Sequence, residues 1–153
     1  MSPERKLQEL HLTLPPAPKA MAVYKPIVVV GSMAYVSGHG PLKDDGKYIA
    51  GVVGKDLTQE DGYKAARQVG LAVLSTVKAG VGSLDKVKRL VKTLGLVNCT
   101  ADFKDQPKVI NGFSDLMAEV FGPEAGIGAR SAVGAVALPN NIAVEVECIF
   151  ELN

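Results

Sequence analysis

The chain has 153 residues, a formal net charge of +1 and 47% hydrophobic residues. This length predicts a single domain, and the near-neutral charge argues against a protein that binds nucleic acid through a broad basic surface. Tryptophan is absent, and aromatic residues make up only 5% of the chain. The predicted core therefore consists mainly of Val, Leu, Ile, Ala and Gly.

Several sequence features bear on the compartment of the protein. Residues 1–14 carry several charges and contain no apolar run of the kind found in a signal peptide. Cys99 and Cys148 lie in strand-like segments without the spacing of a disulfide framework or a metal site, so we expect free thiols. The uncharged run at residues 26–42 is broken by glycines and a proline, which excludes a membrane span. We therefore expect a cytoplasmic protein with no membrane partner.

The N-terminal third combines an arm with a hairpin. Residues 1–23 are predicted to form an N-terminal arm with a short helical turn and a proline-rich lead-in. Residues 27–30 and 33–37 are rich in β-branched residues and flank a Gly-Ser pair, which predicts a β-hairpin. A further short strand is expected at residues 48–53.

The next segment is predicted to be helical. Thr58 can cap a first turn together with Asp61, and apolar residues then recur at spacings of three and four. Gly80 is the expected end of this helix. The β-branched run at residues 87–99 predicts a central strand.

The C-terminal third repeats the pattern of a helix followed by strands. A second helix is predicted to begin near Pro107 and to end at the Gly-Pro pair that starts at Gly122. Strands are expected at residues 129–137 and 142–152. The second of these strands alternates strictly between apolar and other residues.

The resulting order, β-β-(β)-α-β-α-β-β, predicts one α+β domain over residues 24–153. It should contain a mixed sheet with two helices on one face and a hairpin at each end. The opposite face would carry small residues such as Ala135, Ala137 and Gly95. Self-association is the simplest way to bury such a face.

The sequence lacks the residues that most common kinds of catalytic site require. No glycine-rich phosphate loop opens a helix. His11 and His39 are the only histidines, and neither has a partner at metal-ligand spacing, so no metal is expected. Ser37 and His39 alone are a weak basis for a nucleophilic triad. The basic residues between 86 and 92 lack interleaved aromatic residues for base stacking.

Two features attract a functional interpretation. Arg130 follows a glycine-rich loop and lies among small residues, where it could hold a carboxylate or could equally make a structural pair. Glu145 and Glu147 share one face of the last predicted strand. They could serve a site, face solvent, or neutralise Arg130.

Three C-terminal segments together form a recognisable pattern: A-R-S-A-V at 129–133, L-P at 138–139 and V-E-V-E at 144–147. They resemble the C-terminal signature of the Rid family, also called YjgF or L-PSP, the reactive intermediate deaminases. The V-S-G-H segment at 36–39 resembles the V-S-G-Q of that family, and Tyr24 stands at its tyrosine spacing. The resemblance covers residues 24–152.

The resemblance implies a chorismate-mutase-like fold and a homotrimer with clefts between subunits. Members of the family hydrolyse 2-imino acids to 2-keto acids and ammonia without a metal or cofactor. The chain is thus expected to be an imine or enamine deaminase, a hydrolase that acts on a small carboxylate. A non-catalytic binder of small carboxylates is an alternative, and an endoribonuclease, the older label of the family, is a more distant one.

The same resemblance implies roles for two charged residues. Arg130 would hold the carboxylate of the substrate, and Glu145 would position or activate the attacking water. We expect Glu145 to lie on the strand next to that of Arg130, and we expect the arginine to keep the glutamate ionised.

Further site residues follow from the motif match. Tyr24 would line the cleft, and Ser37 and Gly38 would contact the ligand. Asn111 is the candidate for an asparagine that the family uses on its second helix.

Two departures from the family pattern keep the binder alternative open. Lys25-Pro26 stands where the family has Ser-Gln, which adds a cation near the expected cleft. Ala132 stands where many members have cysteine.

Overall fold

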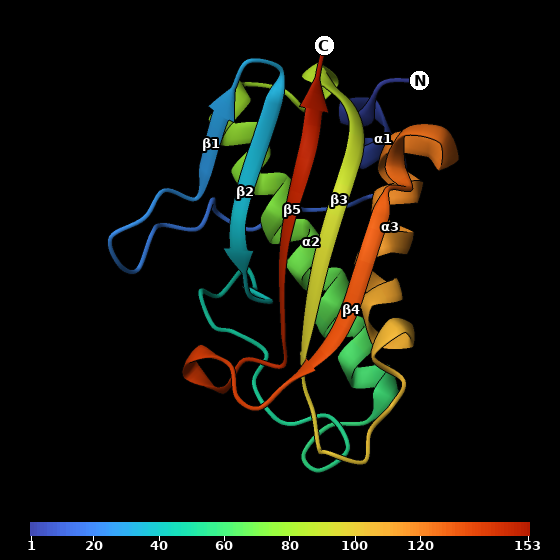
Figure 1. Cartoon of the computed structure of the whole chain (residues 1–153). Helices are drawn as coiled ribbons and strands as arrows, with labels where there is room; N and C mark the ends of the chain where they lie inside the picture. Colours follow the sequence, from blue (N-terminus) through green and yellow to red (C-terminus); the bar gives the residue numbers. More distant parts are fainter.

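Five strands form one sheet in the computed structural model, which describes all of residues 1–153 (Figure 1). The strands are β1 (Ile27–Val30), β2 (Met33–His39), β3 (Val87–Asn98), β4 (Ala129–Ala135) and β5 (Val144–Leu152). Their order across the sheet is β1-β2-β5-β3-β4, and only the β3–β4 pair is parallel. The predicted mixed sheet is therefore confirmed.

Three helices complete the fold: α1 (Pro3–Glu9), α2 (Gln59–Val81) and α3 (Gln106–Gly126). Two short 3-10 turns, η1 (Leu84–Lys86) and η2 (Pro139–Asn141), join the regular elements. Helices α2 and α3 pack side by side on the same face of the sheet, as predicted (Figure 1). None of the helices has both the length and the apolar character that crossing a membrane requires.

The start of α2 was predictable from its cap, but its end was not. The Thr58 hydroxyl accepts a hydrogen bond from the Asp61 amide at 3.1 Å, and the Asp61 carboxylate accepts one from the Thr58 amide at 2.9 Å. The helix runs past the expected stop at Gly80 to Val81, and Gly82, which has a φ of 94°, caps its C-terminal end. Gly80 instead allows close packing, because a Cβ there would lie 2.7 Å from Cγ2 of Ile27.

Helix α3 begins and breaks where its punctuating residues predict. Pro107 lies in its first turn, and Gly122 interrupts the helical backbone with a φ of 85°. A short turn then leads to β4.

The expected C-terminal hairpin is wrong. Strand β4 pairs only with β3, and β5 inserts between β2 and β3. The connection between β4 and β5 therefore crosses the end of β3, and η2 lies within it. The strand expected at residues 48–53 is reduced to isolated bridges, one of which joins Ala50 to Ile142.

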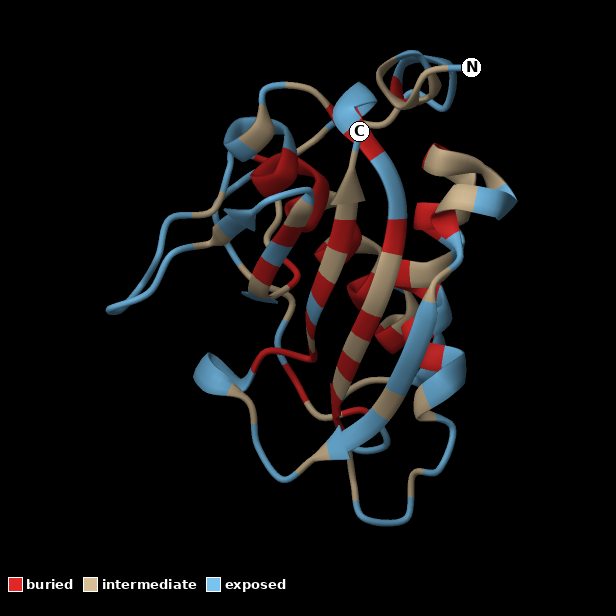
Figure 2. Cartoon of the chain, turned by 45° about the horizontal axis from the view of Figure 1, so that its top comes forward, coloured by how far each residue is buried: buried red, intermediate tan, exposed pale blue.

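The core lies between the sheet and the two long helices. Alternate residues of β5 face it: Val144, Val146, Cys148 and Phe150. Gly95 also faces the helices, contrary to expectation, since a Cβ there would lie 2.6 Å from Cδ1 of Ile110. The opposite face leaves Val28, Tyr35 and Val133 about half exposed, and Figure 2 shows β4 as largely exposed.

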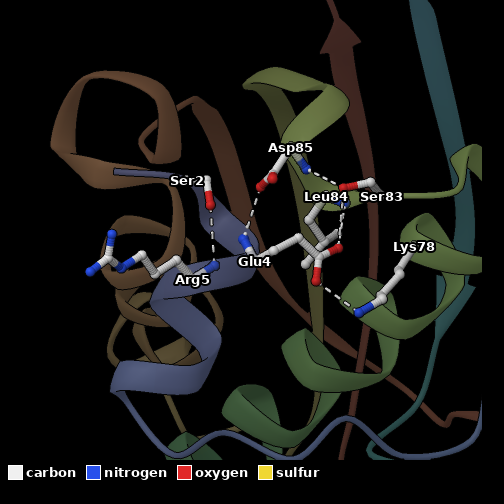
Figure 3. A network of polar contacts seen from close by, with 7 residues as sticks. All are labelled: Ser2, Glu4, Arg5, Lys78, Ser83, Leu84 and Asp85. Atoms are coloured by element: carbon white, nitrogen blue, oxygen red, sulfur yellow. Dashed lines mark hydrogen bonds and ion pairs between the residues drawn. The ribbon is translucent and has the colours of Figure 1, made fainter.

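The first helix is held at one end of the domain by a polar network (Figure 3). The Glu4 carboxylate accepts hydrogen bonds from the Lys78 ammonium at 2.7 Å and from the Leu84 amide at 2.9 Å. The Glu4 amide donates to the Asp85 carboxylate at 3.0 Å. Leu7, one turn further on, is only 6% exposed and belongs to the core.

The segment after α1 links this anchor to the sheet edge. The Ser75 hydroxyl on α2 donates to the Pro15 carbonyl at 2.6 Å. A loop then projects from the edge of the sheet before β1, as Figures 1 and 2 both show. Tyr24 lies on this loop.

Candidate functional site

A cavity of about 490 Å³ opens on the face of the sheet that the helices leave uncovered. Five residues singled out by the sequence line it: Tyr24, Ser37, Gly38, Glu145 and Glu147. The loop before β1, the end of β2 and the start of β5 thus converge there. We call this cavity the acidic pocket, because its lining includes Glu145 and Glu147 but no Lys or Arg.

Ser37 and Tyr24 order the rim of the acidic pocket. The Ser37 hydroxyl donates to the Lys25 carbonyl at 2.5 Å, and the Ser37 amide donates to the Pro26 carbonyl at 2.9 Å. The Tyr24 hydroxyl accepts a hydrogen bond from the Met21 amide at 3.3 Å. These bonds fix the loop against the end of β2 and place the Tyr24 ring beside the cavity.

Gly38 makes room for the carboxylate of Glu145. A Cβ at residue 38 would lie 2.6 Å from Oε2 of Glu145, which no side chain tolerates without moving that group. Burial raises the pKa of Glu145, and the nearby charge of Glu147 raises it further. The expectation that Arg130 holds this carboxylate ionised is therefore wrong within one chain.

Arg130 lies in a different part of the molecule. Its Nη1 donates to Oδ1 of Asn111 at 2.8 Å and to the Ser114 hydroxyl at 3.1 Å, and its Nη2 donates to the Pro107 carbonyl at 3.5 Å. A cavity of about 250 Å³ lies against these side chains. We call Arg130, Asn111 and Ser114 the arginine cluster.

The structure brings Arg130 and Asn111 together but separates both from Glu145. Strand β3 lies between the strands of Arg130 and Glu145, so the expectation of neighbouring strands is wrong. The arginine reaches toward α3, whereas Glu145 points away from the helices. One chain therefore contains two separate groups of candidate residues.

Sequence reasoning did not identify Ser114, Tyr48 or Asn140. Ser114 lies three residues after Asn111 on α3, so helical spacing could have found it once Asn111 was a candidate. Tyr48 and Asn140 line the acidic pocket from two loops. Nothing in their local sequence indicates this position.

His39 is a buried link between β2 and α2. Its Nδ1 donates to the Ser37 carbonyl at 2.5 Å, so Nε2 accepts from the Thr76 hydroxyl at 2.7 Å. Burial lowers the pKa of His39, although the bond to Ser37 acts in the opposite direction. A neutral imidazole with both nitrogens engaged supports the wall behind Gly38.

Two further observations concern metal-ligating side chains and the basic segment. No group of three or more His, Cys, Asp or Glu side chains is placed to hold a metal ion. In the basic segment at residues 86–92, Lys88 pairs with Glu151 at 2.9 Å and Lys92 donates to Ser131 at 3.3 Å. These lysines are engaged with the sheet itself.

Comparison with known proteins places this architecture in a family. Residues 4–152 match the family described as "YjgF/chorismate mutase-like, putative endoribonuclease". Protein TCP17 of Trypanosoma cruzi is 44% identical over 147 residues, which cover 96% of this chain and 92% of that protein.

Solved structures of similar proteins support the same family assignment. The protein Atu1372 of unknown function from Agrobacterium tumefaciens is 38% identical, with a TM-score of 0.89 over 99% of this chain and 94% of that chain. A "putative endoribonuclease" from Shewanella oneidensis is 33% identical, with a TM-score of 0.94 over 99% and 100%. This chain therefore belongs to the YjgF/chorismate mutase-like family.

Proposed function

We propose that the protein hydrolyses 2-imino acids to 2-keto acids and ammonia in a cleft between two subunits of a homotrimer. The observation that carries this proposal is the separation of the arginine cluster from the acidic pocket. Each holds one part of the chemistry, and a second copy of the chain could bring the two together. The uncovered face of the sheet, with Val28, Tyr35 and Val133 exposed, is available for such an assembly.

The charges of the two groups match the two ends of the substrate. A 2-imino acid carries a carboxylate at one end and a protonated imine next to it. Arg130 is exposed, and its Nη1 is oriented by Asn111 and Ser114 while its Nε has no partner in the chain. A guanidinium held in this way is suited to bind a carboxylate through two parallel hydrogen bonds. The acidic pocket favours the cationic imine.

Glu145 is the candidate general base. Its raised pKa makes it a better proton acceptor than an exposed glutamate. It would take a proton from water as the oxygen attacks the imine carbon, which gives a carbinolamine. The same proton would then pass from Glu145 to the nitrogen. Glu145, again a carboxylate, would take the hydroxyl proton as the carbon–nitrogen bond breaks, so that ammonia leaves and the 2-keto acid forms. Positioning contributes most of the rate gain, because the substrate is already reactive.

A coupled assay tests the proposed activity. An amino-acid oxidase generates the imine, and semicarbazide traps the fraction that survives. The proposal predicts that the protein lowers the semicarbazone signal. An unchanged signal, together with binding of 2-keto acids, would identify a non-catalytic carboxylate binder instead. Cleavage of RNA that persists through repeated purification would favour the nuclease function named for some relatives.

A further inference from the structure

The turn η2 contains two consecutive residues in the left-handed region of the backbone. Asn140 has a φ of 55° and Asn141 has a φ of 56°. Asparagine adopts this conformation more readily than most residues, but two in succession are uncommon outside glycine. The position of the turn is relevant to function, because Asn140 lines the acidic pocket together with Glu145.

Asn141 has a structural reason for its conformation. Its side-chain oxygen accepts a hydrogen bond from Nδ2 of Asn98 at 3.0 Å, and its carbonyl accepts one from the Gly51 amide at 2.8 Å. Asn98 is buried and also donates to the Ile142 carbonyl at 3.1 Å. Asn141 therefore fastens the turn to the end of β3 and to the loop that precedes α2.

No comparable contact explains the left-handed conformation of Asn140. Its side chain is exposed, and its amide makes no hydrogen bond with the rest of the chain. The anchored Asn141 and the bridge between Ala50 and Ile142 nevertheless hold its backbone in place. The structure thus fixes the backbone that carries this free amide at the rim of the pocket. Strained positions of this kind recur where a protein holds a ligand.

The remaining wall of the pocket limits what this amide can meet. Met21, Pro139 and Ile142 are apolar, and the ring of Tyr48 lies beside them. Glu145 and Glu147 would repel a second carboxylate on the ligand. The part of the pocket beside Asn140 is therefore suited to an uncharged side chain of mixed character.

We propose that Asn140 determines specificity by donating a hydrogen bond to an uncharged oxygen in the side chain of the bound 2-imino or 2-keto acid. This inference rests on the proposed function, since it assumes that Arg130 of a second subunit holds the carboxylate. We place the reacting carbon at Glu145 and the ligand side chain along the wall toward η2, since Glu145 and Asn140 line the same cavity. The ligand class is a 2-oxo or 2-imino acid with an ether, carbonyl or hydroxyl group in its side chain.

Three 2-oxo acids and one variant test the proposal by calorimetry on the full-length protein. The probes are pyruvate, 2-oxohexanoate and 4-methoxy-2-oxobutanoate; the last two differ only in that an ether oxygen replaces a methylene group. Asn140→Gly removes the amide and keeps a residue that accepts the left-handed backbone. We expect the affinity of the ether relative to 2-oxohexanoate to fall by roughly 3- to 10-fold in this variant, the usual effect of one lost hydrogen bond. The affinity for pyruvate, whose methyl group cannot reach the rim, should stay the same.

Asn141→Gly is the matched control. It makes the same substitution at the adjacent left-handed residue but removes the anchor to Asn98. We expect the thermal midpoint to fall while the affinity ratio of the two longer probes stays near its wild-type value. This variant therefore separates damage to the turn from loss of a ligand contact.

The possible results are distinct. An unchanged ratio in Asn140→Gly would overturn the role of Asn140 and leave the proposed function intact. An equal loss of affinity for all three probes would also overturn it, because the amide would then contact the shared 2-oxo acid group. If the wild-type protein binds none of the probes and leaves the imine signal unchanged, the proposed function and this inference both fail.

Discussion

In the proposed reaction, recognition of the substrate carboxylate depends on Arg130. Asn111 and Ser114 both accept from its Nη1, so the plane of the guanidinium is set before a ligand arrives. We predict that Arg130→Ala abolishes the binding of 2-keto acids, measured by calorimetry. Arg130→Lys should fail nearly as completely, since an ammonium cannot form the paired hydrogen bonds of a guanidinium. Wild-type affinity in a folded Arg130→Ala protein would show that the site is elsewhere.

Glu145 should affect turnover rather than binding. Replacing it with glutamine keeps its shape beside Gly38 but removes the base, so turnover should fall by roughly 10²- to 10⁴-fold while 2-keto acid affinity is retained. Normal turnover in this variant would reduce Glu145 to a structural residue.

The pH profile provides a second test of the same group. Burial and Glu147 raise the pKa of Glu145, so activity in the wild-type protein should decline on the acid side above the ordinary glutamate value of 4.5. Glu147→Gln removes one of these causes. It should therefore shift the acid limb of the kcat profile to lower pH. If the acid limb does not move in Glu147→Gln, ionisation of Glu145 does not control the pH dependence of kcat.

The sequence identified some of the candidate site residues but not others. Arg130 and Glu145 stood out from their sequence context, the motif resemblance supplied their roles and the candidate Asn111, and Asn140 was not identified. The motif preserves chemical groups along the chain, but the face on which a side chain lies depends on strand pairing. Gly95 shows the difficulty: β3 has register irregularities against β5, so counting along the strand did not give its face.

At the scale of elements, local signals were reliable and long-range pairings were not. The cap at Thr58 and the break at Gly122 depend on residues a few positions apart, and both were predictable. The insertion of β5 between β2 and β3 depends on contacts between distant parts of the chain. No local feature of residues 138–141 distinguishes a hairpin from a connection that crosses a strand end.

The contact of α1 with the domain leads to a prediction about stability. Burial opposes ionisation of Glu4, but hydrogen bonds from Lys78, Leu84 and Ser83 outweigh it and lower the pKa of Glu4. Glu4→Gln should destabilise the protein by roughly 1 kcal/mol at pH 7. This corresponds to a thermal midpoint about 2–4 °C lower. Glu9→Gln, on the same helix but with only exposed partners at 3.7 Å, is the control and should change little.

The pH dependence of this effect has a definite sign. Because the pKa of Glu4 is below its ordinary 4.5 in the folded protein, the stabilisation is complete above that value and is lost as pH falls through the folded pKa. The midpoints of wild type and Glu4→Gln, measured by calorimetry, should therefore converge in acid. A difference that persists at the lowest accessible pH would contradict the assignment.

At the scale of the whole molecule, the account depends on assembly. The arginine cluster faces α3, and the acidic pocket opens on the uncovered side of the sheet. A single chain cannot place one substrate between them. In a closed trimer each of three interfaces could pair the arginine cluster of one subunit with the acidic pocket of the next.

Mixed trimers test this claim most directly. Arg130→Ala and Glu145→Gln chains, each inactive alone, are unfolded together in equal amounts and refolded, and imine hydrolysis is then measured. If the cleft lies between subunits, half of its arginines and half of its glutamates are intact at random, so about a quarter of wild-type activity should return. If both residues act within one chain, every site lacks one of them, and activity that stays at the level of the separate variants would contradict the account.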